Sequence, residues 1–287
     1  MSEALQERGR RLSGEPWLRI LQALVLLLVL VTGVARVTVA RPAALVTLGI
    51  SDIRAASSVA KAQQSARFDY VQTISVSGQN ASFTMDGEID FAASRSRVVL
   101  DLGDAGKALG IGEVEFVSSG STIWVRLPAA KSALTGKGWV SVTLEPGTAV
   151  SNDPTKQLDY LADLGGVPER LGTAEVRGVT TGHYRTSLQA ERVLAAMPKE
   201  LQALTRSGMA AAGLSEIPIE TWIDADGLPR RIETTLSMAD AQSVGRMELF
   251  DYGVPVSITV PGAAETTRVA TLASLYVAAG FPAGILG

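Results

Sequence analysis

Residues 82–91 read Ser-Phe-Thr-Met-Asp-Gly-Glu-Ile-Asp-Phe, with large apolar side chains only at odd positions and polar ones at even positions. Successive side chains of an extended chain point to opposite faces, so this segment has one apolar face and one acidic face. The same period-two pattern returns about ten times before the C-terminus. The pattern predicts a large antiparallel sheet that is wet on one side.

Other segments show this alternation, or the β-branched and aromatic content that is typical of strands. Strands are expected at residues 68–76, 82–91, 96–102, 114–118, 122–127, 139–144, 174–179, 184–188, 217–223, 230–237 and 244–252. Helices are expected over residues 51–66, from Asn152 to Gly165, and over residues 193–205 around Pro198. Residues 103–112 and 128–138 are expected to be loops. This order of elements predicts an α+β fold, a large curved antiparallel sheet with a few helices against one face.

Composition excludes several classes of protein. The chain of 287 residues has a formal net charge of -3, and such a balance argues against binding to nucleic acid. It has no cysteine, which excludes disulfides, thiolate metal sites and cysteine nucleophiles. Aromatic residues make up only 5%, so the sheet interior must consist mainly of Val, Ile, Leu and Ala.

The N-terminal segment predicts export. Residues 20–35 are apolar apart from Gln22, Thr32 and Gly33, and several arginines precede them. This charge bias places the bulk of the chain outside the cytoplasm. Residues 20–40 are therefore either a transmembrane signal anchor or a cleaved signal peptide. The expected order is a cytoplasmic tail (1–19), this segment (20–40), a linker (41–49), the main domain (50–262) and an apolar tail (263–287).

Several segments of the main domain resemble, in order and spacing, the LppX/LprG-type lipoproteins of mycobacteria. They are residues 67–70 (RFDY), 121–127 (STIWVRL), 138–140 (GWV), 175–184, 219–232 and 250–256, and together they span about residues 50 to 262. The resemblance extends to the wider LolA-like group of periplasmic carriers. It implies a half-barrel sheet wrapped over helices around an apolar cavity, and transport of lipids, glycolipids or lipoproteins between envelope layers.

One position departs from that family. Residues 30–34 are similar to a lipobox, but Val34 stands where the modified cysteine is expected. Without this sulfur no diacylglycerol can be attached, so the resemblance implies tethering by a retained membrane helix instead.

The polar residues offer little chemistry. His183 is the sole histidine, which excludes a histidine metal cluster and a Ser-His-Asp triad. Ser58 and Lys61 match S-x-x-K, but the companion motifs of that hydrolase class are absent. Asp224-Ala225-Asp226-Gly227 resembles a calcium loop, yet Thr235 occupies the twelfth position, so a turn is expected. No cofactor and no metal is expected, and a hydrolase that uses Ser58 and Lys61 is the third interpretation.

The apolar face of the sheet is therefore the candidate site. Few large aromatic side chains are available to fill the space under a wide curved sheet, and an acyl chain gains about 0.8 kcal/mol for each methylene that it buries there. The leading hypothesis is a membrane-tethered, extracytoplasmic lipid carrier, and the alternative is an envelope sensor or interaction module with a filled core. The predicted lipid-binding residues are Phe83, Met85, Ile89, Phe91, Val98, Leu100, Val114, Phe116, Ile123, Val125, Ile219, Ile223, Ile232 and Leu236.

Overall fold

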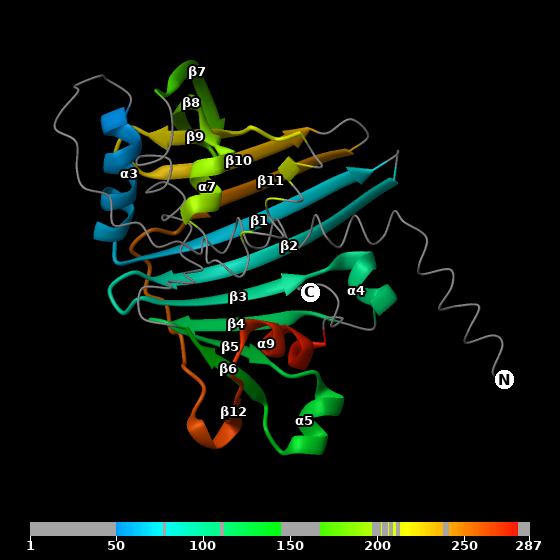
Figure 1. The fold of residues 1–287 in the computed structure, drawn as a ribbon. Helices are drawn as coiled ribbons and strands as arrows, with labels where there is room; N and C mark the ends of the chain where they lie inside the picture. The colour runs from blue at the N-terminus through cyan, green and yellow to red at the C-terminus, as the bar shows by residue number, and fades with distance from the viewer. Residues whose placement is uncertain are drawn as a thin grey trace.

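A single sheet dominates the fold. The computed structural model describes residues 50–76, 79–109, 112–144, 167–196, 202, 206, 209–210, 213–237 and 241–280. Its strands form one 12-stranded sheet in the order β12-β6-β5-β4-β3-β2-β1-β11-β10-β9-β8-β7. Neighbouring strands are antiparallel except β12 and β6, which run parallel. The predicted α+β class and curved antiparallel sheet are confirmed (Figure 1).

At the centre of the sheet, a strand from the N-terminal part of the domain pairs with a strand from its C-terminal part. The strand β1 (Ser65–Val76) pairs with β2 (Gln79–Asp90) on one side and with β11 (Ala241–Phe250) on the other. Sequential hairpins extend the sheet outward from both partners. The other strands are β3 (Arg95–Asp101), β4 (Val114–Ser119), β5 (Thr122–Arg126), β6 (Trp139–Thr143), β7 (Glu169–Val176), β8 (Val179–Gln189), β9 (Glu216–Asp224), β10 (Pro229–Ser237) and β12 (Thr266–Arg268).

The helices are short, and two of them correct the sequence analysis. The described helices are α3 (Ile50–Ala62), α4 (Gly103–Leu109), α5 (Ala129–Thr135), α7 (Ala190–Ala196), α9 (Leu272–Ala279) and the 3₁₀ turn η1 (Ala263–Glu265). The expected loops at residues 103–112 and 128–138 contain α4 and α5, so those two expectations are wrong. In α4, Lys107 pairs with Asp104 at 2.9 Å across one turn. In α5, Pro128 precedes the first residue and Gly136 caps the end at φ 65°.

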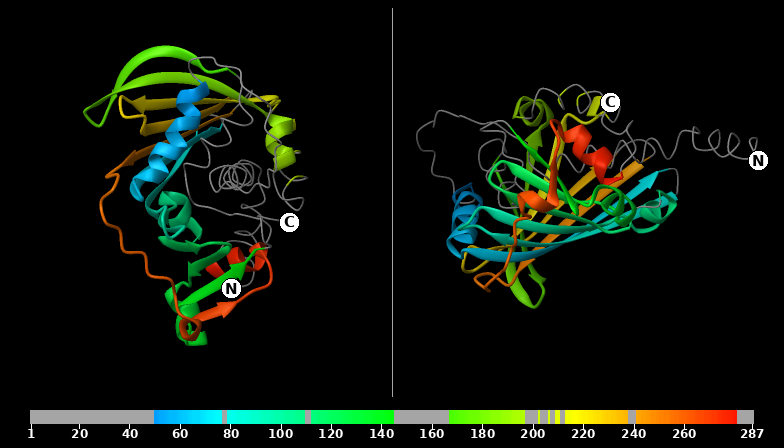
Figure 2. Two further views of the ribbon diagram at one scale, coloured as in Figure 1. Left: turned by 90° about the vertical axis from the view of Figure 1, so that its left-hand side faces the viewer. Right: turned by 90° about the horizontal axis from the view of Figure 1, so that it is seen from below.

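The sheet is strongly curved. Figure 2 shows its two ends turning toward the same side, where α7 and α9 lie. The helix α9 packs on β5 and β6, α7 packs on β8, and α3 packs on β1 and β10. The large hydrophobic core, which includes Leu194 of α7 and Leu275 of α9, lies between these helices and the concave face.

The convex face carries a second, smaller apolar cluster. After β11 the chain runs without regular structure along the outside of the sheet to η1 (Figure 2). Val256 and Ile258 of this connection pack against Val117, Trp124 and Trp139 of β4, β5 and β6. The connection therefore covers part of the convex face near one edge of the sheet.

The C-terminal residues add to the same sheet. The sequence analysis leaves residues 263–287 as an apolar tail, whereas the structure pairs β12 with β6 and packs α9 beside it. Leu275 and Ala279 of α9 are buried in the main core.

Several expectations fall on residues that the structure does not describe. They are the predicted anchor and linker within residues 1–49, the helix from Asn152 to Gly165 and much of the helix over 193–205. Within the described ranges no helix is both long enough and apolar enough to cross a membrane.

Candidate functional site

The predicted lipid-binding residues lie together. All of them belong to, or pack against, the main hydrophobic cluster on the concave face, including Phe91 and Phe116, which are only partly buried. The buried face of β2 is the one that the alternation predicts. Phe83, Met85 and Ile89 are buried, and Ser82, Thr84 and Asp86 on the opposite face are exposed. The structure thus gathers these side chains on one face from six strands, β2 to β5, β9 and β10, with Phe91 just after the end of β2.

Strand pairing arranges the concave face into rows. In one row, Met85, Leu100 and Val114 of β2, β3 and β4 stand side by side. In the next row, Val98 pairs with Phe116, which pairs with Val125. We call the concave surface of β2 to β6 the apolar half. Its inward positions are filled almost entirely by hydrocarbon, with the hydrogen-bonded Ser96–Ser118 pair at one end.

Gly87 shows how closely this surface is packed. It pairs with Phe68 of β1, and the ring of Phe68 lies over it. A Cβ atom at Gly87 would stand only 2.1 Å from Cε1 of Phe68. The glycine is required because the aromatic ring occupies the space that any larger residue would need.

The other side of the concave face, which we call the polar half, is formed by β1 and β8 to β11. Its central feature is a chain of hydrogen bonds among buried side chains. The Tyr70 hydroxyl donates to the Gln72 side-chain oxygen, and Gln72 Nε2 donates to Ser243 Oγ at 2.9 Å. Gln72 has 0% of its surface exposed. Burial raises the pKa of the Tyr70 hydroxyl, so it remains a proton donor.

Gly245 makes room for this group. It pairs with Gln72 across β1 and β11, and a Cβ atom there would lie 2.5 Å from the Tyr70 hydroxyl oxygen. The sequence analysis did not single out this cluster. The signal was present, because Gln72 falls in the inward phase that Tyr70 and Ile74 define in the same strand.

Two hydroxyls are buried without a partner, one in the polar half and one on a helix that packs against it. Within the described part of the chain, Ser57 Oγ and Thr221 Oγ1 are buried without a hydrogen-bond partner. Thr221 is on β9, facing inward between Tyr184 of β8 and Ile232 of β10. Ser57 is on α3, which packs against β1 and β10. A buried polar group without a partner is rare in native proteins, so these two hydroxyls require an explanation.

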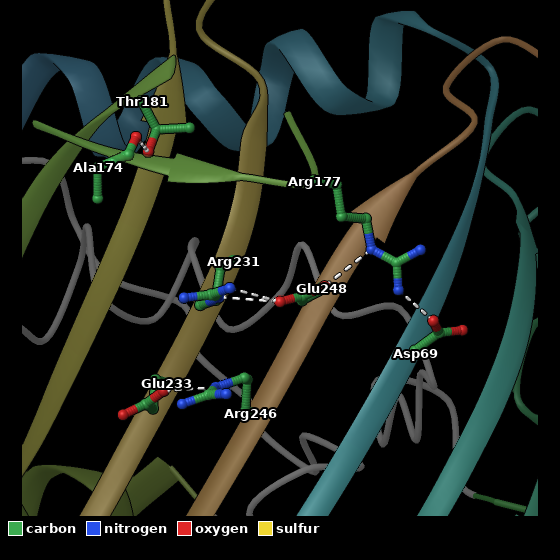
Figure 3. Close-up of polar contacts among 8 residues, drawn as sticks. All are labelled: Asp69, Ala174, Arg177, Thr181, Arg231, Glu233, Arg246 and Glu248. Atoms are coloured by element: carbon green, nitrogen blue, oxygen red, sulfur yellow. Dashed lines mark hydrogen bonds and ion pairs between the residues drawn. The ribbon is translucent and has the colours of Figure 1, made fainter. Parts of the chain in front are cut away.

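The convex face carries charged side chains that form ion pairs with one another. Arg177, in the tight turn between β7 and β8, reaches Glu248 of β11 at 2.8 Å and also contacts Asp69 of β1 (Figure 3). Its guanidinium lies 4.0 Å from the ring centroid of Phe250. Arg231 of β10 approaches Glu248 at 2.7 Å. Burial opposes ionisation of Glu248, but hydrogen bonds from Arg177 and Arg231 prevail and lower its pKa.

His183 is also on the convex face. Its ring is stacked on Trp222, with centroids 4.2 Å apart, and its Nε2 is 2.6 Å from a Glu220 oxygen. Arg185 hydrogen-bonds the second oxygen of Glu220. Nε2 of His183 and both carboxylate oxygens of Glu220 thus take part in surface pairing. No arrangement for catalysis follows from them.

The weaker chemical candidates also have structural explanations. Ser58 is exposed on α3, and its neighbour Ser57 is the buried one. Asp224 closes the β9–β10 turn, since its carboxylate accepts from the backbone N–H groups of Asp226 and Leu228 and from Arg230. The expected turn is confirmed. No group of three or more His, Cys, Asp or Glu side chains in the described ranges is arranged to hold a metal ion.

Comparison with known proteins gives similarity of structure only. No protein-family model and no curated protein matches the sequence. Among solved structures the chain is similar to lipoprotein LppX of Mycobacterium tuberculosis (15% identity, TM-score 0.45, 73% of this chain and 97% of that one). It is also similar to LprF of Mycobacterium bovis (15% identity, TM-score 0.47, 75% of this chain and 97% of that one).

A LolA superfamily protein from Nitrosomonas europaea is also similar (10% identity, TM-score 0.33, 72% of this chain and 93% of that one). These are proteins of the LppX/LprG and LolA-like groups to which the sequence resemblance points.

Proposed function

We propose that this chain is an extracytoplasmic, membrane-tethered lipid carrier that holds the acyl chains of a lipid or glycolipid against the concave face of its sheet. The observation that carries the proposal is the apolar half, a continuous hydrocarbon surface on β2 to β6. Charged side chains of these strands, such as Arg97, Glu115 and Arg126, pair with one another on the convex face.

The energetics favour an acyl ligand. Each methylene moved from water onto an apolar surface contributes about 0.8 kcal/mol, so about twelve methylenes supply roughly 10 kcal/mol before ordering costs. Binding of this kind is non-covalent and needs neither a cofactor nor a metal. In this proposal the tether is the apolar segment 20–40, and the arginines that precede it support an extracytoplasmic main domain.

Native mass spectrometry of the full-length chain tests the proposal. We expect the chain to carry co-purified lipid, visible as one or more mass additions that organic extraction removes. A chain that carries no lipid and takes up none when offered it would favour the interaction module with a filled core.

A pair of variants tests the location. Leu100→Trp adds bulk to the centre of the apolar half, where the side chain is almost fully buried, and should abolish lipid uptake. Val99→Trp places the same bulk on the convex side of the same strand and should leave uptake unchanged. Equal uptake by both variants would place the lipid elsewhere.

A further inference from the structure

We infer that the polar half of the concave face is a subsite for the uncharged, hydrogen-bonding part of the ligand, such as a hydroxyl, ester or sugar group. This inference rests on the proposed function and adds a direction to it. The hydrocarbon would lie on β2 to β6, and the polar group would lie across β9, β10, β11 and β1. The ligand class is then an amphiphile whose polar part carries no charge.

The first argument is the composition of two adjoining rows. One row runs Thr186, Ile219, Thr234, Gly245, Gln72, and the next runs Tyr184, Thr221, Ile232, Met247, Tyr70. Ser243 stands beside Gln72 and accepts its hydrogen bond. Hydroxyl and amide groups thus recur across the whole width of this half.

The second argument is the unpaired hydroxyl of Thr221. Its residue is 1% exposed, it faces inward, and it has no partner among the described residues. A folded protein loses stability by burying such a hydroxyl unless something binds to it. Ser57 of α3, the helix that packs on β1 and β10, carries a second such hydroxyl. A ligand hydroxyl or carbonyl would satisfy these groups, and hydrocarbon would not.

The third argument concerns charge. None of the positions in these two rows carries a charged side chain. Burying an ionised carboxylate or phosphate without a cation is strongly unfavourable, whereas a hydroxyl or ester needs only one or two hydrogen bonds. The rows therefore favour an uncharged polar group over an ionised one.

The experiment compares three probes that share one hydrocarbon chain: monomyristoylglycerol, myristate and tetradecane. The full-length chain is delipidated, held in amphipol at neutral pH, and loaded with the uncharged dye Nile red, which each probe displaces. We expect monomyristoylglycerol to bind most tightly of the three. Tighter binding of myristate, or equal binding of tetradecane, would overturn the inference.

Thr221→Val removes the hydroxyl and keeps the shape of the side chain. It should reduce the preference for monomyristoylglycerol over tetradecane by about fivefold, the value of one hydrogen bond. Thr221→Ser keeps the hydroxyl and should keep the preference, and Thr84→Val on the exposed convex side of β2 should also leave it unchanged. An unchanged preference in Thr221→Val would overturn the inference.

The melting temperature of the lipid-free protein tests the role of the Thr221 hydroxyl in the absence of ligand. The lipid-free Thr221→Val variant should melt at the same temperature as the wild type or higher, because a buried, unpaired hydroxyl has been removed. A lower melting temperature would assign the hydroxyl to internal stabilisation and overturn the inference. If none of the probes displaces the dye from the wild type, it is the proposed function itself that fails.

Discussion

The two halves of the concave face share one sheet and one pattern of burial, yet they differ in chemistry. On β2 to β6, inward side chains such as Met85, Leu100 and Val125 are apolar, and the Ser96–Ser118 pair stands at one end. On β1 and β8 to β11, Gln72 and Thr221 are as deeply buried as those residues but are polar. Burial alone therefore does not define this surface. The difference teaches that one continuous core can hold both an apolar and a hydrogen-bonding region.

The two regions also tolerate change for different reasons. The apolar half depends on the complementary shapes of its side chains, so it is sensitive to any gain or loss of volume. The hydrogen-bonded group Tyr70–Gln72–Ser243 of the polar half depends on the pairing of its members, so it is sensitive to the loss of one partner more than to the loss of all of them. Four substitutions, taken from the largest expected effect to the smallest, test this contrast.

Leu100→Ala should lower the free energy of unfolding by about 3–4 kcal/mol, because it removes most of a leucine side chain that is almost fully buried. Urea denaturation measures the loss. Val99→Ala, on the half-buried convex side of the same strand, should cost less than about 1 kcal/mol. Similar losses in the two variants would mean that the concave side of β3 is no better packed than the convex side.

Gly87→Ala should cost about 2–3 kcal/mol, because the new methyl group overlaps the ring of Phe68. Combining it with Phe68→Leu should recover part of the loss, since the smaller side chain vacates the space above Gly87. Gly138→Ala, where φ is also outside the left-handed region and no atom lies within 4 Å of the added methyl, is the matched control for the glycine-to-alanine change. A double variant that is no more stable than Gly87→Ala alone would contradict this account.

Gln72→Leu should cost about 2 kcal/mol, because it leaves the Tyr70 hydroxyl and Ser243 without their partner. Adding Tyr70→Phe and Ser243→Ala should restore most of the stability, since no orphaned group then remains. Thermal unfolding of the single and triple variants provides the measurement. A triple variant that remains as unstable as the single one would remove the distinction between the halves.

Arg177→Met should cost about 1 kcal/mol, because the pairs that it breaks are partly exposed. Burial opposes ionisation of Glu248, but hydrogen bonds from Arg177 and Arg231 lower its pKa below the ordinary 4.5. A lowered pKa stabilises the fold fully above the unfolded value, and this contribution is lost as the pH falls through the folded value. The difference between variant and wild type should therefore shrink below pH 4.5 and stay constant above it.

Melting temperatures measured across the acid range check this dependence. Arg246→Met removes an exposed pair with Glu233 on the same face and serves as the matched control, with a smaller effect at neutral pH. A difference for Arg177→Met that is independent of pH would show that the contact with Phe250 dominates instead.

The alternation of side chains predicted which faces of the strands are buried, but its limits are instructive. The sequence predicted that Phe83 and Met85 lie on the buried face of their strand, because apolar and polar residues alternate without interruption there. The sequence predicted β8 only from Tyr184 onward, because Thr180, Thr181 and Gly182 carry no apolar signal of their own. That part of β8 forms because its backbone pairs with both β7 and β9.

Neither the helices α4 and α5 nor the polar half was predicted from the sequence, for related reasons. Gly103 and Gly106 are typical of a loop, and α4 forms where tertiary packing against β2 overrides that tendency. Gln72 and Thr221 are polar residues in an inward phase, a signal that is visible in the sequence but indicates function only when their surroundings are known. Strand order, which brings β1 beside β11, depends on contacts that a local pattern does not encode.

That central pairing determines when the molecule is able to fold. Arg67 pairs with Phe250, so the middle of the sheet cannot be completed until almost the whole chain is available. Contacts between such distant residues form slowly, because the long intervening loop must first be closed. An unfinished chain therefore lacks the pairing of β1 with β11 that joins its two series of hairpins into one sheet.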